Sequence, residues 1–229
     1  MISLKNARKV FRGADFETVA LDGINLEIDK GEFVAVMGKS GSGKSTLLNI
    51  IGCMDKLTDG CYSLDDVDVC GLGMIKLDQI RKKKISFIFQ NYELMDHYTI
   101  YENIELPLLA AKVSRKQRRI RIKEVMVRLG IEGLARKYPK QVSGGEQQRT
   151  AIARALVSGN DYILADEPTG ALDQGNAEEL MQILKEIHKS GKTILMVTHD
   201  KDIAAYADRI IELCDGRIQE TGDFRQAAK

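Results

Sequence analysis

The chain of 229 residues has few cysteines, few prolines and no long apolar run. Its 4 cysteines are widely scattered, and no pair has the close spacing of a zinc or redox motif, so we expect reduced, mostly buried thiols. No run reaches the ~18 apolar residues that a membrane span needs, and no signal-peptide core opens the chain. These absences predict a soluble, cytosolic protein that acts on membranes only through a membrane-spanning partner.

Charge of either sign is also not in excess. The net charge is +1, from 34 basic and 33 acidic residues, so no global electrostatic attraction to nucleic acid is expected. Hydrophobic residues make up 44% of the chain, enough for a stable core and against disorder. The length suits one domain over residues 1–229, with room for an inserted lobe.

Short apolar runs alternate with helical patterns along most of the chain. Continuous apolar runs at 33–37, 85–89, 162–165, 194–197 and 210–213 predict strands that are buried on both faces. Ala177, Leu180, Met181 and Leu184 recur at helical spacing before Gly191. Alternating strands and helices predict an α/β fold with a mixed, mainly parallel sheet. Hairpin-like segments near 2–28 and 61–70 predict a small antiparallel lobe. Because few residues follow the hairpin near Gly216, we expect no C-terminal regulatory domain.

The pattern changes to helix without strand between about residues 92 and 148. Ile122, Val125, Met126 and Leu129 form one helical stripe there, and Gly130 is placed to end that helix. This segment predicts a helical lobe inserted into the α/β domain. We therefore divide the chain into a core, residues 1–91 and 149–229, and a helical lobe, residues 92–148.

A phosphate-binding motif lies between a predicted strand and a predicted helix. Gly38-Lys39-Ser40-Gly41-Ser42-Gly43-Lys44-Ser45 matches the pattern G-x-x-x-x-G-K-[ST] in the context that the pattern requires. Glycines let backbone N–H groups surround phosphate oxygens, and the helix N-terminus adds its dipole. Lys44 is expected on the β- and γ-phosphates, the Ser45 hydroxyl on Mg²⁺, and Thr46 on a further phosphate oxygen.

The strand at 162–165 ends in two acids, Asp166 and Glu167. Carboxylates there lie at the carboxyl edge of the sheet, where α/β proteins bind their ligands. Asp166 is expected to hold Mg²⁺, and Glu167 to orient and deprotonate an attacking water. Acids at a strand end also commonly begin loops and cap helices. The presence of Lys44 in the phosphate-binding motif is what favours a catalytic interpretation of Asp166 and Glu167.

A second glycine-rich helix start is not explained by the first motif. Val142-Ser143-Gly144-Gly145-Glu146-Gln147-Gln148-Arg149 begins a predicted helix shortly before the Asp166 strand. Here the sequence resembles the ABC-transporter ATPase family, which carries its signature motif in this position. The resemblance covers nearly the whole chain, and it implies the P-loop ATPase fold with an antiparallel lobe and a helical lobe.

Further positions resemble the motifs of that family. Gln90 is placed like the Q-loop glutamine, Ala171-Leu172-Asp173 like the D-loop, His199 like the switch histidine and Phe11 like the aromatic that stacks on adenine. Taken alone, His199 is better explained as a partly buried strand-end histidine, and Phe11 as a packing residue. The order and spacing of the motifs favour the functional interpretation.

The resemblance implies an ATPase that works as a homodimer with ATP and Mg²⁺. Two copies would enclose two ATP molecules, each held by the Lys44 loop of one copy and by Ser143, Gly144, Gly145 and Glu146 of the other. His199 and Asp173 would lie near the γ-phosphate, Gln90 would contact Mg²⁺ or the water, and catalysis would fall to Glu167, His199, Gln90 and Lys44. The implied place is the cytoplasmic face of the plasma (inner) membrane, on a separate integral membrane subunit, without nucleic acid.

Several positions depart from the commonest family pattern. Lys39 stands where proline is usual, Glu146 where the signature has glutamine, Gly170 where serine is frequent and Asp66 at a hairpin turn usually given to glycine. None of these removes a catalytic group. The segments 52–55, 142–149 and 168–170 resemble the subgroup that serves macrolide export, lipoprotein release and antimicrobial-peptide resistance.

Two questions stay open in the sequence. Within the family, an ATPase of iron–sulfur assembly or of another soluble complex is the alternative to a transporter subunit. Residues 112–128 hold eight basic residues and one acid, which indicates either a solvated helix face or a surface for anionic lipid or an acidic partner.

Overall fold

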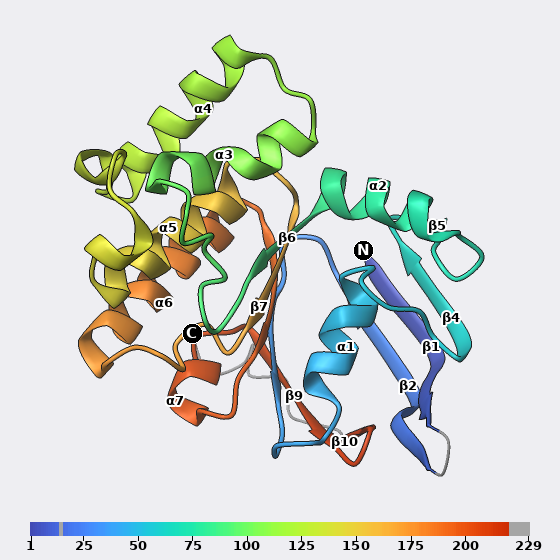
Figure 1. Ribbon diagram of the computed structural model, residues 1–229. Coiled ribbons are helices and arrows are strands. Elements are labelled where there is room, and N and C mark those ends of the chain that lie inside the picture. The colour runs from blue at the N-terminus through green and yellow to red at the C-terminus, as the bar shows by residue number, and fades with distance from the viewer. Residues whose placement is uncertain (14–15, 220–229) are drawn as a thin grey trace.

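A computed structural model describes residues 1–13 and 16–219 of the chain. An antiparallel sheet near the N-terminus contains β1 (Ile2–Arg12), β2 (Glu17–Ile28), β4 (Asp59–Leu64) and β5 (Val67–Asp68) in the order β2-β1-β4-β5 (Figure 1). The β4–β5 turn is formed by Asp65 and Asp66, at φ of 50° and 64°. Aspartate tolerates this left-handed backbone better than most residues, so the turn closes without glycine.

The second sheet runs through the centre of the molecule. It contains β3 (Phe33–Met37), β6 (Ile85–Ile88), β7 (Tyr162–Asp166), β8 (Thr193–Val197), β9 (Arg209–Cys214) and β10 (Arg217–Gln219) in the order β10-β9-β3-β8-β7-β6. Every neighbouring pair is parallel except β9 and β10, which form a hairpin. The carboxyl ends of the parallel strands therefore share one edge of this sheet.

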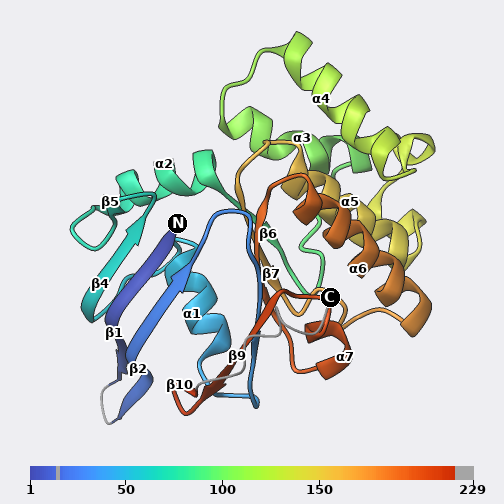
Figure 2. The same cartoon turned by 180° about the vertical axis from the view of Figure 1, so that it is seen from behind.

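Helices cover both faces of the central sheet. The α-helices are α1 (Lys44–Ile51), α2 (Met74–Lys84), α3 (Ile100–Ala110), α4 (Arg115–Arg128), α5 (Gly144–Leu156), α6 (Gln174–Lys189) and α7 (Lys201–Ala204), and two short 3₁₀ turns, η1 (Glu132–Leu134) and η2 (Pro139–Gln141), precede α5. Seen from both sides, α5 and α6 lie on one face of the sheet, whereas α1 and the antiparallel sheet lie on the other (Figures 1 and 2).

Alternating residues of each central strand enter two different hydrophobic cores. Phe33 and Ala35 of β3 pack into the core beneath α5 and α6, and Val34 and Val36 pack into the core beneath α1 and the antiparallel sheet. Because successive strand residues point to opposite faces, a strand between two cores must be apolar throughout. This accounts for the continuous apolar runs in the sequence.

The helical lobe shares the first of these cores. Ile104 of α3, Ile122 of α4 and Ile152 of α5 pack in the same cluster as Phe33 and Ile194 of the central sheet. Thr99, Ser114 and Ser143 cap α3, α4 and α5, each by accepting a hydrogen bond from a backbone N–H of the first turn. Helix α5 runs through the predicted boundary between the helical lobe and the core at residues 148 and 149. The division of the chain at that boundary stays a prediction.

The expected α/β class, with a mixed, mainly parallel sheet, is confirmed. The boundaries differ by a residue or two: β6 ends at Ile88, so that Gln90 lies in the following turn, and β9 begins at Arg209. Gly130 follows the α4 C-cap at φ 64°, as expected for a residue that ends a helix. No helix within residues 1–13 and 16–219 is long and apolar enough to span a membrane.

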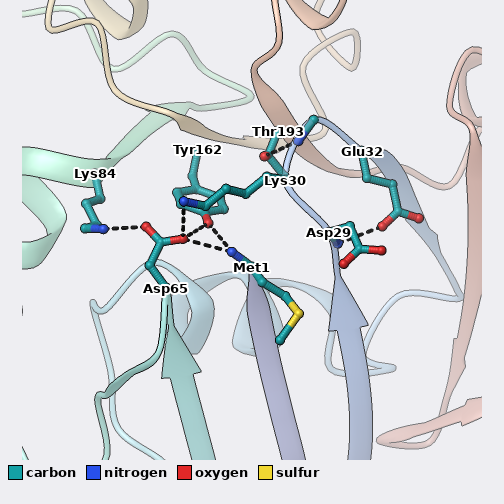
Figure 3. Close-up of polar contacts among 9 residues, drawn as sticks. Met1, Asp29, Lys30, Glu32, Asp65, Lys84, Tyr162 and Thr193 are labelled. Atoms are coloured by element: carbon teal, nitrogen blue, oxygen red, sulfur yellow. Dashed lines mark hydrogen bonds and ion pairs between the residues drawn. The ribbon is translucent and has the colours of Figure 1, made fainter.

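A polar cluster around Asp65 joins the two sheets (Figure 3). The Asp65 carboxylate accepts hydrogen bonds from the Tyr162 hydroxyl of β7 and from Lys84 at the end of α2, and Lys30, after β2, lies 3.1 Å away. The Met1 ammonium also donates to it, at 2.8 Å. Burial acts to raise the pKa of Asp65, but these donors hold it well below its usual value.

Candidate functional site

The glycine-rich loop at residues 38–43 joins β3 to α1 at the carboxyl edge of the central sheet. Helix α1 begins at Lys44, and its own hydrogen bonding begins with Leu47 N–H donating to Gly43 O at 2.8 Å. The N–H groups of Lys44, Ser45 and Thr46 precede that bond and are the unpaired donors of the helix start. This arrangement suits an anionic ligand.

Gly43 can be no other residue in this backbone. Its φ of 103° is left-handed, and a Cβ placed there would lie 2.4 Å from the carbonyl oxygen of Ala20 in β2. The β9–β10 hairpin supports the loop from the other side, because Gly216 N–H donates to Ser42 O at 3.0 Å. The loop is therefore held between two strands that lie far apart in the sequence.

The Lys44 side chain lies over the loop rather than in solvent. Only 7% of Lys44 is exposed, and its Nζ donates to the carbonyl oxygens of Gly38 and Lys39, both at 2.8 Å. These two bonds hold a positive charge beside the free N–H groups. The loop thus offers the charge and the donors that a phosphate chain requires.

A cavity of about 620 Å³ opens over the loop. It is lined by the loop between residues 40 and 46, by residues 18–20 of β2, and by Glu167 and His199. The phosphate motif, the acid after β7 and the histidine after β8 therefore meet at one site, as expected. The contribution of β2 was not expected, since its residues alternate like any half-exposed strand.

Asp166 and Ser45 connect the two halves of the site. Burial, followed by the negative charge of Glu167, raises the pKa of Asp166, while a hydrogen bond with the Ser45 side chain and the charge of Lys44 act in the opposite sense. A carboxylate and a hydroxyl in contact are oxygen ligands of the kind that Mg²⁺ prefers. Within residues 1–13 and 16–219, no group of three His, Cys, Asp or Glu side chains could hold a metal. A metal at this place would draw on the oxygen atoms of Asp166 and Ser45 together with those of a bound ligand.

Glu167 faces the cavity from a constrained backbone. Its φ is 44°, and its N–H donates to Val197 O of β8 at 2.9 Å. Its Oε1 lies 3.2 Å from Nδ1 of His199, whose side chain is 68% exposed. The histidine thus contacts the acid that stands at the mouth of the cavity, and a left-handed non-glycine residue at this point is typical of a functional site.

Gln90 lies beside the site but not in the cavity lining. Its side chain packs on Gly170, where a Cβ would lie 2.8 Å from Gln90 Nε2. Gly170 N–H donates to Glu167 O at 3.0 Å, so Gln90 rests on the turn that begins with the catalytic candidate. The absence of a side chain at Gly170 is what makes room for Gln90.

The second glycine-rich helix start lies on the helical lobe. Ser143 caps α5: its Oγ accepts from Glu146 N–H at 3.3 Å, while Oε2 of Glu146 accepts from Ser143 N–H at 2.7 Å and from Ser143 Oγ at 3.0 Å. The bond from Ser143 N–H and the contact with its hydroxyl lower the pKa of Glu146. None of residues 143–146 lines the cavity over the Lys44 loop. One copy of the chain therefore does not bring the two glycine-rich motifs together.

Gln148, a buried residue of the signature segment for which the sequence predicted no separate role, connects α5 to the end of β7. Gln148 is 1% exposed, and its Nε2 donates to Pro168 O at 2.9 Å.

Asp173 caps α6, and its carboxylate accepts from the backbone N–H of Asn176 at 3.0 Å and from its side-chain amide at 2.6 Å. Gly145 in turn lies against Asn176. Asn176 of α6 thus contacts both Gly145 of the signature segment and Asp173.

Phe11 lies at the edge of the site. It pairs with Thr18 across the β1–β2 hairpin, and Thr18 lines the cavity, but Phe11 itself does not. Its ring is 42% exposed, and Lys9 Nζ lies 4.9 Å from the ring centroid. An exposed ring one strand away from the cavity is available for stacking, and its role stays a prediction.

Comparison with known proteins gives consistent results. The sequence pattern of the family described as "ABC transporter" matches residues 21–170. The chain is 50% identical over 218 residues to the macrolide export ATP-binding/permease protein MacB of Campylobacter fetus, and 48% identical to MacB of Escherichia coli. Each alignment covers 95% of this chain and 34% of the relative, so the chain spans about a third of the length of these relatives.

Solved structures match over nearly the whole chain. A dimeric structure of MJ0796, described as a bacterial ABC transporter cassette, is 45% identical with a TM-score of 0.91, and it covers 98% of this chain and 99% of that one. A second MJ0796 structure, described as a post-hydrolysis state bound to ADP and Pi, is 44% identical with the same TM-score.

Proposed function

The chain belongs to the ABC transporter family, and we propose that it is the ATP-hydrolysing subunit that powers a transporter of the export or mechanotransmission type. The proposal starts from the phosphate-binding loop, Glu167 and His199, which meet at one cavity. The relatives named for macrolide export motivate the branch within the family. Hydrolysis of ATP to ADP and phosphate would change the contact between two copies of the chain.

The single observation that carries the proposal is the separation of the two glycine-rich helix starts. The Lys44 loop lines the cavity, and the Ser143 segment of the same copy does not. A second copy would place its Ser143 and Gly145 over the ligand. ATP would thus be enclosed between two copies, in keeping with the dimeric cassette named above.

The residues in and beside the cavity have separate tasks in this proposal. Lys44 and the N–H groups at the start of α1 bind the phosphates. Ser45, Asp166 and Gln90 would hold Mg²⁺, which would neutralise phosphate charge. Glu167 takes a proton from the attacking water at its carboxylate. His199, 3.2 Å from that carboxylate, orients it and contacts the γ-phosphate. Phe11 supplies a face for the adenine.

The partner that we propose is an integral membrane permease on a separate chain. It would dock beside Gln90, where Met95 and Tyr98 are exposed apolar residues at the entrance to the helical lobe. The assembly would place this chain peripherally on the cytoplasmic face of the plasma (inner) membrane. Purification from detergent-solubilised cells tests this part: a multi-span permease is expected in the complex, whereas soluble assembly factors alone would contradict it.

Replacement of Glu167 tests the chemistry. We expect Glu167→Gln to abolish turnover, a loss of at least about 100-fold, because the amide cannot accept the proton. The same variant still binds ATP, so gel filtration is expected to show an ATP-dependent dimer. Hydrolysis at the parental rate by this variant would show that Glu167 is not the base.

A mixing experiment tests whether the site is shared. In a Glu167→Gln background, Lys44→Ala and Gly145→Asp each damage both sites of a homodimer. A mixture of the two chains forms heterodimers in which one site combines an intact loop with an intact Ser143 segment. We expect an ATP-dependent dimer in the mixture and in neither variant alone. The same amount of ATP-dependent dimer in the mixture and in each variant alone would contradict a site shared between two copies.

A further inference from the structure

Helix α4 is the outermost helix of the lobe in both views (Figures 1 and 2). It packs on the rest of the protein through Ile122, Val125 and Met126, which are buried. Its opposite side is turned to solvent over the whole length of the helix. This solvent side takes no part in the nucleotide site described above.

Residues 112–128, which comprise α4 and the turn before it, hold eight basic residues, and seven of these are unpaired within the described part of the chain. The exception is Arg118, whose Nε lies 2.7 Å from Glu105 Oε1. The other seven are exposed and make no ion pair or side-chain hydrogen bond within residues 1–13 and 16–219; they are Lys112, Arg115, Lys116, Arg119, Arg121, Lys123 and Arg128. The chain as a whole has a net charge of +1, so this positive surface is local.

Two apolar side chains lie among these charges. Lys116, Ile120, Lys123 and Val127 follow one another at spacings of four, three and four residues, so they form one stripe along the helix. Ile120 is 45% exposed and Val127 is 54% exposed. Arg119 flanks the stripe on the side toward the lobe. We call these five residues the α4 stripe.

We infer that the α4 stripe binds the surface of a bilayer that contains anionic phospholipid. Lysine side chains extend their ammonium groups to phosphate headgroups while their methylene stems follow apolar surface. Isoleucine and valine between them would enter the boundary of headgroups and acyl chains. An interleaved basic and apolar stripe thus matches both layers of a lipid interface.

The composition of the stripe favours lipid over an acidic protein partner. A protein partner would require acidic groups in register with single residues, whereas six of the unpaired charges here are spread around the exposed side of α4 and the seventh, Lys112, precedes the helix. An anionic membrane surface attracts all of them through its potential, without register. The inference rests on the membrane location proposed above, and it adds a contact that needs no permease.

Vesicle cosedimentation of the full chain tests the inference. Vesicles that contain phosphatidylglycerol are expected to retain the protein at low salt, and vesicles of phosphatidylcholine alone are not. Each basic residue near an anionic surface strengthens adsorption by about fivefold. The variant Lys116→Glu/Arg119→Glu/Lys123→Glu is therefore expected to bind at least about 100-fold more weakly.

Two further variants make the result specific. Lys5→Glu/Lys76→Glu/Lys83→Glu carries the same change in net charge at exposed positions of other elements, and it is expected to bind nearly as the parent does. Ile120→Ser/Val127→Ser keeps every charge, and its binding is expected to fail at lower salt than that of the parent. Circular dichroism confirms that each variant is folded.

The inference is overturned if the parent does not bind phosphatidylglycerol vesicles, or if the control triple variant loses as much binding as the α4 variant. Neither result bears on the shared ATP site, because the ATP-dependent dimer of Glu167→Gln forms in solution without lipid. Loss of that dimer with intact vesicle binding would conversely overturn the proposed function alone.

Discussion

At the scale of single residues, the contact between Gln90 and Gly170 ties the turn after β6 to the turn after β7. A Cβ at Gly170 would lie 2.8 Å from Nε2 of Gln90 and 3.4 Å from two of its carbon atoms. Serine, frequent at this position in the resembled family, therefore does not fit here without moving Gln90. Gly170 acts as a positioning residue for a side chain that is proposed to contact Mg²⁺ or the attacking water.

We predict that Gly170→Ser lowers kcat by roughly 10- to 100-fold, as small displacements in active sites do. The Michaelis constant for ATP is expected to change little, because the Lys44 loop is untouched. Gly175→Ser is the matched control, since its Cβ would meet only Asp173 Oδ1 at 3.6 Å. Equal turnover of both variants and the parent would show that the position of Gln90 is unimportant.

Asp65 gives a prediction about stability and pH. Its side chain is 11% exposed, forms ion pairs with two lysines and accepts a hydrogen bond from the Tyr162 hydroxyl. These contacts keep the folded-state pKa of Asp65 below the ordinary value of about 3.9. Asp65→Asn is expected to lower the free energy of unfolding by about 2 kcal/mol at neutral pH. Because the pKa is depressed, this stabilisation is present above about pH 4 and is lost as the pH falls toward the folded-state pKa.

Urea unfolding at neutral and acidic pH measures the effect. The difference between the parent and Asp65→Asn is expected to shrink as the pH falls below about 4. Asp66→Asn is the control: Asp66 occupies the same turn at φ 64° but is exposed, so its replacement is expected to be nearly neutral. A pH-independent loss in Asp65→Asn would show that the charge of Asp65 does not stabilise the fold.

At the scale of elements, two helices of the lobe begin in the same way. Thr99 and Glu102 form a capping box at the start of α3, and Ser143 and Glu146 form one at the start of α5. In both boxes the glutamate accepts from the backbone N–H and the hydroxyl of the capping residue. Only the α5 box holds residues that we propose to contact ATP.

We predict that Glu146→Ala and Glu102→Ala each lower the free energy of unfolding by about 1 kcal/mol. Only Glu146→Ala is expected to reduce the ATP-dependent dimer of the Glu167→Gln chain severalfold, because it frees Ser143 from its fixed position. Glu146→Gln keeps the acceptor and is expected to retain the dimer. Analytical ultracentrifugation measures all three, and an equal loss of dimer in Glu102→Ala would contradict the assignment.

The elements differ in how well the sequence predicts them. The strands β3, β7 and β8 follow directly from their apolar runs, because a strand between two cores has no polar face. The end of β6 was placed one residue late, since Phe89 continues the apolar run beyond the last sheet pair at Ile88. The three-residue β10 has no periodicity of its own, and it exists because it pairs with β9.

At the scale of the whole molecule, the nucleotide site lies where both sheets meet the loop. No group of three His, Cys, Asp or Glu side chains within residues 1–13 and 16–219 is placed to hold a metal, so Mg²⁺ alone is expected to change the melting temperature little. ATP with Mg²⁺ is expected to raise it, by the equivalent of about 2.7 kcal/mol at 100 times the dissociation constant. Lys44→Ala is expected to show no rise, and a rise with Mg²⁺ alone would reveal a metal site elsewhere.

The sequence predicts the motif residues of the site better than the other residues that line its cavity. Lys44, Ser45, Asp166 and Glu167 could be assigned from spacing, because each follows a strand that ends at the same sheet edge. Residues 18–20 could not, since only the fold of β2 over the loop brings them to the cavity. The separate role of Gln148 was missed because a buried glutamine within an apolar helix face gives no signal until its partner, Pro168 O, is known.

The continuous core beneath α5 and α6 has a consequence for protein engineering. Ile104, Ile122 and Ile152 of the lobe interdigitate with Phe33 and Ile194 of the central sheet, so the lobe possesses no interior of its own. Removing residues 92–148 as a transplantable module would expose this shared core on both pieces. A chimera with a relative would have to exchange the inner faces of α3, α4 and α5 together with the strands beneath them.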